Sequence, residues 1–359
     1  MRISSVLSLV VVLICDACGG GASSSGKHDG DLLHAWAVGL IEDGGIILES
    51  HDSGNTWVTA RTVARGLEGV TFVGSENGWA VGKGLILHTA NGGDSWTTQV
   101  DGSDSFVSVA FVSTTRGVVV GRALPTSGTF GERLVLFTDD GGVQWTRAPI
   151  ASGGRQFGMK VFLSFVCFTG DHATGIALGN GVDGNAVLLS TDAGQSWSDI
   201  TTRVAEGGFP GGGCGPASLW VAQFEGGLYR SDDKGVTWKD VSGGLPIGFR
   251  GGLEEIVFVD NARGWAVGAH ADERPVILRT TDGGDSWNEQ PLAGSASGVL
   301  RGAAFVSPAE GAVVGSTSFS PPAPFTPLAF FAASGSDEWT RATIDFSEGI
   351  LSDVAFAVE

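Results

Sequence analysis

The segment TTDGGDSW at 280–287 is the clearest copy of an eight-residue phrase, here called the box, that recurs along the chain. The other copies are SHDSGNTW at 50–57, TANGGDSW at 89–96, TDDGGVQW at 138–145, STDAGQSW at 190–197, SDDKGVTW at 231–238 and AASGSDEW at 332–339. The tryptophans that close the boxes are Trp57, Trp96, Trp145, Trp197, Trp238, Trp287 and Trp339. Successive tryptophans are 39 to 52 residues apart, and one four-stranded propeller blade is roughly 40–50 residues long.

Two further phrases precede the boxes. WAVG occurs at 36, 79 and 265, with the related segments VVVG at 118, IALG at 176, LWVA at 219 and AVVG at 312. A V-x-F pattern lies upstream of it, as VTF at 70, VAF at 109, VCF at 166, IVF at 256, AAF at 303 and VAF at 354. These short runs are rich in Val, Ile and aromatic residues and are separated by Gly, Asn and Asp, which is typical of antiparallel strands.

The two ends of the chain complement each other. The first unit, DLLHAWAVG, has no V-x-F strand before it, whereas the chain finishes with LSDVAFAV after the last box. We therefore predict an all-β fold over residues 31–359. It is a seven-bladed β-propeller of four-stranded antiparallel blades, in which the C-terminal strand completes blade 1. Such closure leaves no free sheet edge to invite aggregation.

The composition of the box predicts how its turn is built. The side chain at its third position can accept hydrogen bonds from backbone N–H groups of the same turn. These acceptors are Asp52, Asn91, Asp140, Asp192, Asp233 and Asp282. The glycine two positions later supplies a positive φ, and the closing tryptophan is expected to pack between sheets.

The box resembles the Asp-box, or bacterial neuraminidase, repeat, and the resemblance covers nearly all of the chain after the first 30 residues. The combination of GWAVG at 264–268 with ILRTTDGGDSW at 277–287 is most similar to the seven-bladed photosystem II assembly and stability factors. The resemblance implies the propeller fold and a scaffold that binds protein. It gives weaker guidance on function, because unrelated hydrolases, receptors and assembly factors share the box.

The first residues are expected to direct export. The apolar stretch at 6–14 is shorter than the roughly 20 residues of a membrane-spanning helix. It is followed by ICDACGGGASSSG at 14–26, which resembles a bacterial lipoprotein signal with lipidation at Cys18. We therefore expect a signal peptide at 1–17, a Gly/Ser tether at 18–30 and an exported protein, periplasmic or at the cell surface, anchored in a bacterial membrane by lipid alone. A plain secretory signal is the alternative.

The net charge of the chain narrows the choice of binding partners, and its cysteines bear on a possible disulfide. The 21 Lys and Arg residues and 39 Asp and Glu residues give a net charge of -18, which argues against binding of nucleic acid or of an anionic membrane surface. Cys167 and Cys214 are the cysteines that follow the tether. They can form a disulfide in an oxidising compartment or remain two buried thiols.

Enzyme chemistry finds little support. A sialidase needs a tyrosine nucleophile, yet the single tyrosine, Tyr229, lies in a strand that leads into a box. A glycan hydrolase needs paired carboxylates in an aromatic cleft, but all 11 tryptophans belong to boxes or second strands. The pairs Glu254–Glu255 and Asp272–Glu273 carry little weight among 39 carboxylates. The histidines show no paired ligand spacing, so we predict no catalytic residue, metal or cofactor.

The remaining function is binding, and we place it on the face opposite the boxes. The longest and least repetitive loops lie there, and they hold many of the arginines. The candidate residues are Arg122, Arg133, Arg155, Arg250, Arg274, Arg301, Phe319 and Phe325. We predict a monomeric, non-enzymatic scaffold that binds a protein or an envelope component. The alternatives are a carbohydrate-active or carbohydrate-binding propeller, and loops that serve only solubility.

Overall fold

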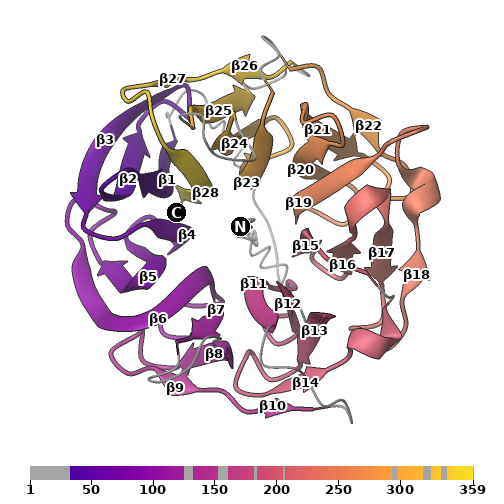
Figure 1. The fold of residues 1–359 in the computed structure, drawn as a ribbon, viewed down its shortest axis with the longest axis horizontal. Helices are drawn as coiled ribbons and strands as arrows, with labels where there is room; N and C mark the ends of the chain where they lie inside the picture. Colours follow the sequence, from indigo (N-terminus) through magenta and orange to yellow (C-terminus); the bar gives the residue numbers. More distant parts are fainter. Residues whose placement is uncertain are drawn as a thin grey trace, which may run out of the picture.

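Short antiparallel strands follow one another around a central axis in the computed structural model, and their sheets are arranged as the blades of a propeller (Figure 1). The structure describes residues 33–124, 132–152, 161–181, 184–204, 207–292, 297–317, 325–332 and 338–358. The helices in this part of the chain are three 3-10 turns, Thr201–Arg203, Phe224–Gly226 and Ser242–Gly244. No helix within the described ranges is long and apolar enough to cross a membrane.

Five hydrogen-bonded sheets contain the strands. The first holds β28 (Ile350–Ala357), β1 (His34–Ile41), β2 (Gly44–Ser50), β3 (Thr56–Val63) and β27 (Thr343–Ile344). The second holds β4 (Leu67–Val73), β5 (Asn77–Thr89), β6 (Thr97–Phe111), β7 (Gly117–Ala123), β8 (Glu132–Thr138) and β9 (Thr146–Arg147). The third holds β11 (Val161–Phe168), β12 (Gly175–Gly181), β13 (Gly184–Ser190), β14 (Trp197–Asp199) and β10 (Ile150–Ala151).

The last two sheets complete the ring. The fourth holds β18 (Lys239–Asp240), β17 (Leu228–Ser231), β16 (Leu219–Ala222), β15 (Gly211–Cys214), β19 (Gly251–Phe258), β20 (Gly264–His270), β21 (Pro275–Thr280) and β22 (Asn288–Glu289). The fifth holds β23 (Val299–Ser307), β24 (Glu310–Ser316), β25 (Pro327–Ala332) and β26 (Thr340–Arg341).

The C-terminal strand closes the ring. β28 pairs with β1 in antiparallel register from His34↔Ala357 to Leu40↔Ile350, so the last strand of the chain hydrogen-bonds to the first described one. Figure 1 shows β28 on the inner side of β1, next to the axis. The predicted all-β propeller and its closure by the C-terminal strand are confirmed.

The number of sheets does not give the number of blades, because neighbouring blades share hydrogen bonds. β6 pairs with β5 through its first half, which ends one blade, and with β7 through its second half, which begins the next. β15 and β19 pair in parallel, from Gly212↔Glu255 to Cys214↔Val257, which merges two antiparallel series into one eight-stranded sheet. Seven blades therefore stay a prediction.

Aromatic stacks join successive blades. Trp79 in β5 stacks on Phe111 in β6 with ring centroids 3.5 Å apart, and Trp145 meets the same Phe111 edge-on. The same stack occurs as Trp36–Phe72–Trp96, Trp220–Phe258–Trp287 and Trp265–Phe305–Trp339. Each stack combines a WAVG tryptophan with the V-x-F phenylalanine and the box tryptophan of the next blade. The three recurring phrases are therefore parts of one contact between blades.

The box turn is held by its own side chains. Asp282 Oδ1 accepts a hydrogen bond from the Ser286 backbone N–H at 3.0 Å, and its Oδ2 accepts one from the Ser286 hydroxyl at 2.6 Å. Thr280 donates its hydroxyl hydrogen to Asp282 and accepts the N–H of Gly284. The corresponding acceptors of a turn N–H are Asp52, Asn91, Asp140, Asp192 and Asp233.

The box glycine is required for two reasons. Gly284 has a φ of 86°, which disfavours any other residue. A Cβ atom at Gly284 would also run into the ring of Trp220, which belongs to the preceding blade. The box turn and its tryptophan therefore pack directly against the neighbouring blade. Five box tryptophans are buried, but Trp145 and Trp238 are only partly buried, so the predicted packing is less complete there.

Buried polar side chains brace the inner strands, and the sequence analysis assigned them no such role. Asp353 in β28 accepts the N–H of Val70 at 2.7 Å, and Glu255 in β19 accepts the N–H of Ala303 at 2.7 Å. Both carboxyl groups are fully buried. Burial raises the pKa of Asp353 well above its usual value. Each brace crosses from one blade to the next.

Cys167 and Cys214 add a covalent link between inner strands. The two residues form a disulfide that joins β11 to β15, with their Cα atoms 5.8 Å apart. Both are buried. Cys214 pairs with Leu219 at the inner-strand position where Phe258 pairs with Gly264. The disulfide therefore lies where other blades place the phenylalanine of the aromatic stack.

The box carboxylates should make stability depend on acid pH. The Ser286 hydroxyl, more than any other group, lowers the pKa of Asp282 from 3.8 to about 2. A depressed folded-state pKa adds stability above pH 4, and this stability is lost as the pH falls from about 4 towards 2. Asp282→Asn should therefore lower the free energy of unfolding by about 1 kcal/mol at pH 7 and by much less near pH 2. Urea denaturation across this range measures both values, and an equal deficit at both pH values would contradict the assignment.

Candidate functional site

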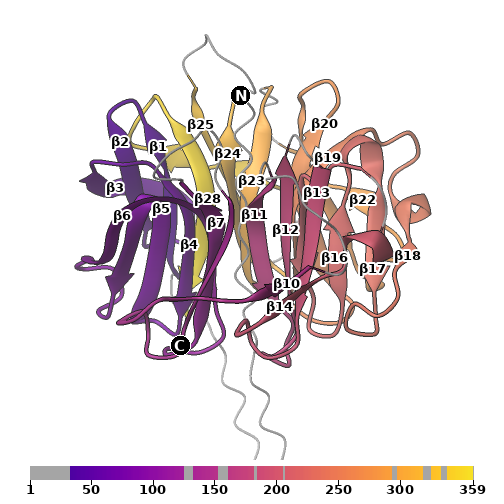
Figure 2. The same cartoon turned by 60° about the horizontal axis from the view of Figure 1, so that its bottom comes forward.

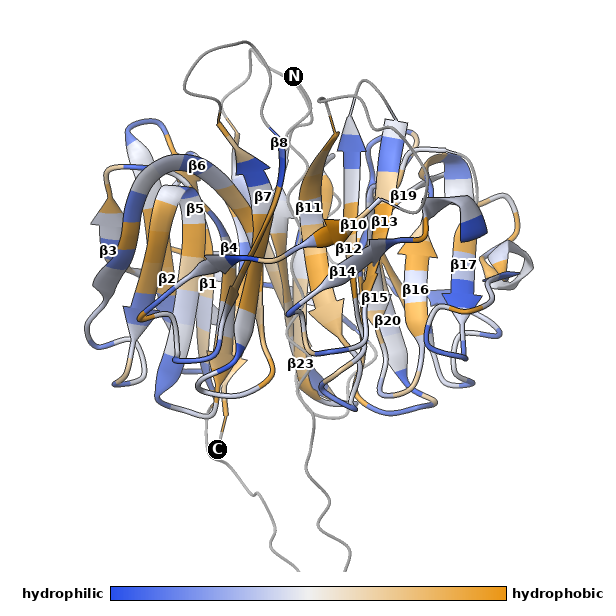
Figure 3. Cartoon of the chain, turned by 90° about the horizontal axis from the view of Figure 1, so that it is seen from below, coloured by the Kyte–Doolittle hydropathy of each residue, from blue (hydrophilic) through white to orange (hydrophobic). Residues whose placement is uncertain are grey.

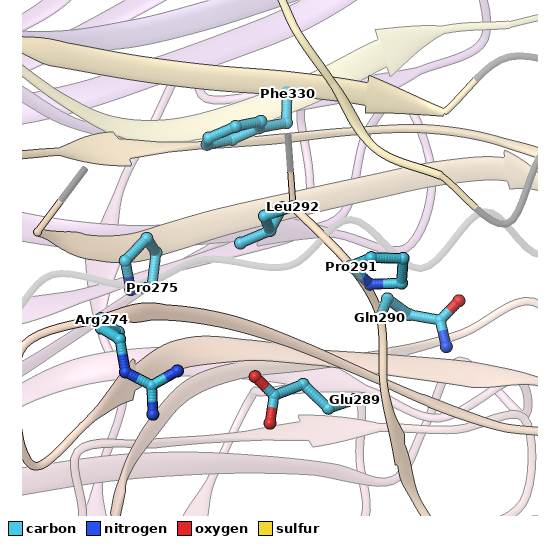
Figure 4. Close-up of a pocket in the computed structure, with 7 residues that line it drawn as sticks. All are labelled: Arg274, Pro275, Glu289, Gln290, Pro291, Leu292 and Phe330. Atoms are coloured by element: carbon cyan, nitrogen blue, oxygen red, sulfur yellow. The ribbon is translucent and has the colours of Figure 1, made fainter. Parts of the chain in front are cut away.

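The rim of the ring opposite the box turns, here called the loop face, carries the turn between β20 and β21 (Figures 2 and 3). A pocket opens between two blades beside this turn. Its volume is about 390 Å³. It lies where β21 and β22 face β25, and its lining residues are Arg274, Pro275, Glu289, Gln290, Pro291, Leu292 and Phe330. Figure 4 shows the charged groups of Arg274 and Glu289 on one side and the Phe330 ring on the other, with Leu292 between them.

The charged side of the pocket is held by neighbouring groups. Arg274 Nε donates to Asp272 Oδ2 at 2.9 Å, and this carboxylate raises the pKa of the guanidinium further. Glu289 Oε1 lies 3.1 Å from Nε2 of His270, whose side chain is mostly buried. The pocket therefore combines the positive charge of Arg274 and the negative charge of Glu289, each held by a neighbouring group, with an apolar floor of Leu292 and Phe330. This arrangement suits the binding of a peptide segment, whose backbone can hydrogen-bond to the charged groups while an apolar side chain enters the pocket.

Apolar side chains extend the site towards the preceding blade, which contains β16 and β17. The ring of Phe249 lies 5.3 Å from that of His270, and Phe224 is 39% exposed. Ile247 is fully exposed in the same loop as Phe249. We call Phe224, Ile247, Phe249, His270 and the pocket residues together the loop-face strip. Exposed apolar groups beside fixed charges are typical of sites that bind another chain.

The predicted binding residues divide into several groups. Arg274 lines the pocket, and Arg250 is exposed beside Phe249, with its carbonyl accepting the N–H of Ala271. Arg122 in β7 and Phe325 are partly buried. Arg155, Phe319 and the predicted lipidation site Cys18 lie outside the described residues, as do the predicted signal peptide and tether.

Arg133 is not an exposed binding residue, and this prediction was wrong. Its guanidinium lies 3.0 Å from Asp199, with only 15% of the Arg133 side chain and 2% of the Asp199 side chain exposed. Asp199 also accepts two hydrogen bonds from Thr201. Arg133 belongs to β8 and Asp199 to β14, so the pair connects consecutive blades. Sequence spacing could not reveal this pairing, because the partners are 66 residues apart.

Arg301, which was predicted to lie on the loop face, is buried instead. It is 5% exposed in the inner strand β23. Burial lowers its pKa, while the nearby carboxylates of Glu254 and Glu68 act in the opposite direction. An arginine near the start of an inner strand thus enters the interior of the ring rather than the loop face.

The described tryptophans supply no surface for stacking sugars. Nine of the 11 are buried, and Trp145 and Trp238 are partly buried against neighbouring apolar residues. Tyr229 in β17 is partly buried, and burial followed by the charge of Asp240 raises its pKa. Glu254 and Glu255 are both buried. The described tryptophans therefore form no open sugar platform, and the Glu254–Glu255 pair is closed to substrate. Asp272 and Glu273 are exposed, and Asp272 accepts a hydrogen bond from Arg274.

Comparison with known proteins supports the fold and gives a partial lead on function. No protein-family model matches the chain. A 98-residue segment is 32% identical to the chloroplastic photosystem II stability/assembly factor HCF136 of Arabidopsis thaliana, which covers 27% of this chain and 23% of that protein. The chain therefore matches only about a quarter of the length of this relative.

Solved structures share the propeller. A GH74 xyloglucanase from Xanthomonas campestris superposes with a TM-score of 0.59 at 12% identity, over 85% of this chain and 52% of that one. A structure described as YCF48 bound to D1 peptide gives a TM-score of 0.49 at 16% identity, over 77% of this chain and 80% of that one. At these identities the xyloglucanase shows the fold alone, and the second overlap is too low to bear on function.

Arg133→Ala tests the structural role given to this residue. It should lower the free energy of unfolding by about 2 kcal/mol, because Asp199 would remain buried without its cation. Arg122→Ala, at a partly buried position with no ion pair to another blade recorded within the described ranges, should cost less than about 0.5 kcal/mol. Urea denaturation measures the free energy of unfolding of both variants. An equally small loss of stability in both would contradict the structural role of Arg133 and support its prediction as an exposed binding residue.

Proposed function

We propose that this chain is an exported, lipid-anchored, non-enzymatic propeller that binds a segment of another protein through the loop-face strip and assists assembly at the cell envelope. The observation that carries the proposal is the strip itself, in which Arg274 and Glu289 flank an apolar floor. The short match to a photosystem II stability/assembly factor supports an assembly role.

We further propose that the ring has seven blades of the Asp-box type. Seven boxes recur in the sequence, and four complete Trp–Phe–Trp stacks repeat among the described residues. Three other inner strands replace the stack with a related contact. In β11 the ring of Phe168 lies 6.1 Å from that of Trp197. Phe356 packs in one cluster with Trp57, and Cys214 packs in one cluster with Trp238.

A carbohydrate-active propeller is the second candidate, and the observation in its favour is the fold shared with a xyloglucanase. Glycan hydrolysis would need two accessible carboxylates beside aromatic platforms. The burial of Glu255 and its bond to the Ala303 N–H argue against that candidate, as does the burial of the tryptophans.

Site-directed photo-crosslinking tests the binding surface. A photoreactive amino acid in place of the fully exposed Ile247 should crosslink a defined protein in native membranes. The same probe at Val236, which is 63% exposed in a box turn, is the matched control on the opposite rim. We expect the product from position 247 to weaken at least severalfold when Arg274→Ala is added. Equal products from both positions, or glycan products alone, would contradict the proposal.

Cys18→Ala tests the anchor. Replacement should move the protein from the membrane fraction to the soluble exported fraction, because a thioether-linked lipid supplies the membrane affinity. Membrane fractionation combined with the intact mass of the mature protein measures this. A Cys18→Ala protein that stays as membrane-associated as the parent would show that the anchor lies elsewhere.

A further inference from the structure

Two histidines and a glutamate meet on the first blade. His34 begins β1, Glu49 lies near the end of β2, and His51 follows β2 directly. The β1–β2 register pairs Ala35 with Ser50, so the next step places His34 opposite His51. Glu49 lies two residues from His51 and therefore shares its face of the sheet. The hairpin itself thus assembles the three side chains.

The possible ligand atoms of this cluster converge. All of them lie within 4.8 Å of one another. His51 Nε2 is 3.5 Å and His34 Nε2 is 3.9 Å from Glu49 Oε2, and the two imidazole rings lie 4.3 Å apart. Solvent does not reach His34 Nε2, which has no hydrogen-bond partner among the described residues. This atom has a lone pair or a proton that the protein leaves unused.

We infer that His34, Glu49 and His51 form a site for a divalent transition-metal ion, with Zn²⁺ as the best fit. Two imidazoles and one carboxylate are a ligand set that zinc accepts, and a water molecule would complete a tetrahedron. Zinc–ligand bonds of about 2.0–2.2 Å place neighbouring ligand atoms roughly 3.3 Å apart. The two imidazole–carboxylate separations, 3.5 and 3.9 Å, need to close by only tenths of an ångström. The widest pair of ligand atoms, at most 4.8 Å apart, needs to close by up to about 1.5 Å.

The surroundings of the cluster allow this rearrangement. The His51 side chain is 66% exposed, so its ring can turn without disturbing the core. Asp94 of the second box acts electrostatically on His34 and adds negative charge near the cluster. Leu33 and Ser53 already join the beginning of β1 to the first box turn by two hydrogen bonds. A bound ion would reinforce this link on the blade where the two ends of the described chain meet.

Zinc titration of the full chain tests the inference. Free thiols are alkylated first, because Cys15 and Cys18 could add ligands in unlipidated protein. Isothermal titration with ZnCl₂ should show one site per chain that 1 mM MgCl₂ does not displace. His51→Ala and Glu49→Gln should each weaken zinc binding about tenfold or more. His172→Asn, in which asparagine suits the φ of 57°, is the matched control and should bind as the parent does.

Thermal melting separates metal binding from folding. In EDTA the parent, His51→Ala and His172→Asn should melt at similar temperatures. Zinc should raise the melting temperature of the parent and of His172→Asn, but not that of His51→Ala, because an ion that binds only the native state stabilises it. Absence of a saturable site, or zinc binding by His51→Ala with parental affinity and stabilisation, would overturn the inference.

Discussion

The structure depends on the contact in which a tryptophan of one blade stacks on a phenylalanine of the next and a box turn closes over both. A four-stranded sheet exposes two apolar faces, and each face is buried only when a neighbouring blade covers it. Trp220, Phe258 and Trp287 show how three short phrases from two blades make one such contact. Gly284 lets the turn approach Trp220 closely enough to complete it. Since every blade needs a neighbour on both sides, the series must return to its beginning.

The contacts between the inner strands, beside the axis of the ring, differ from blade to blade. Asp353 and Glu255 place buried carboxyl groups on backbone N–H donors of the next blade. At β15 the glycines of Gly211–Cys214 leave room for a direct parallel ladder with β19. Buried carboxyl groups are costly unless they are hydrogen-bonded, so these braces favour one arrangement of neighbouring blades over others. The disulfide between β11 and β15 likewise joins two inner strands of neighbouring blades.

Sequence patterns predicted the structural features that repeat from blade to blade. They missed the single contacts between residues that lie far apart in the sequence. The boxes and the unpaired V-x-F strand at the C-terminus predicted the propeller and its closure, because each blade repeats the same local chemistry. The roles of Arg133 and Arg301 depend on partners in other strands that no repeat encodes. The His34–Glu49–His51 cluster follows only once the β1–β2 register is known. The loop-face strip combines residues from five separate segments of the chain, so its pocket could not be predicted from any one segment.

Closure of the ring by β28 is the central claim, and strand complementation tests it most directly. A chain ending at residue 349 lacks the partner of β1 and the carboxylate that braces Val70. Its thermal unfolding is measured by circular dichroism with and without a synthetic peptide of residues 350–359. The account predicts that the truncated chain loses its cooperative transition or melts far below the parent, and that the peptide restores it. A truncated chain that melts cooperatively at the parental temperature without the peptide would contradict the account.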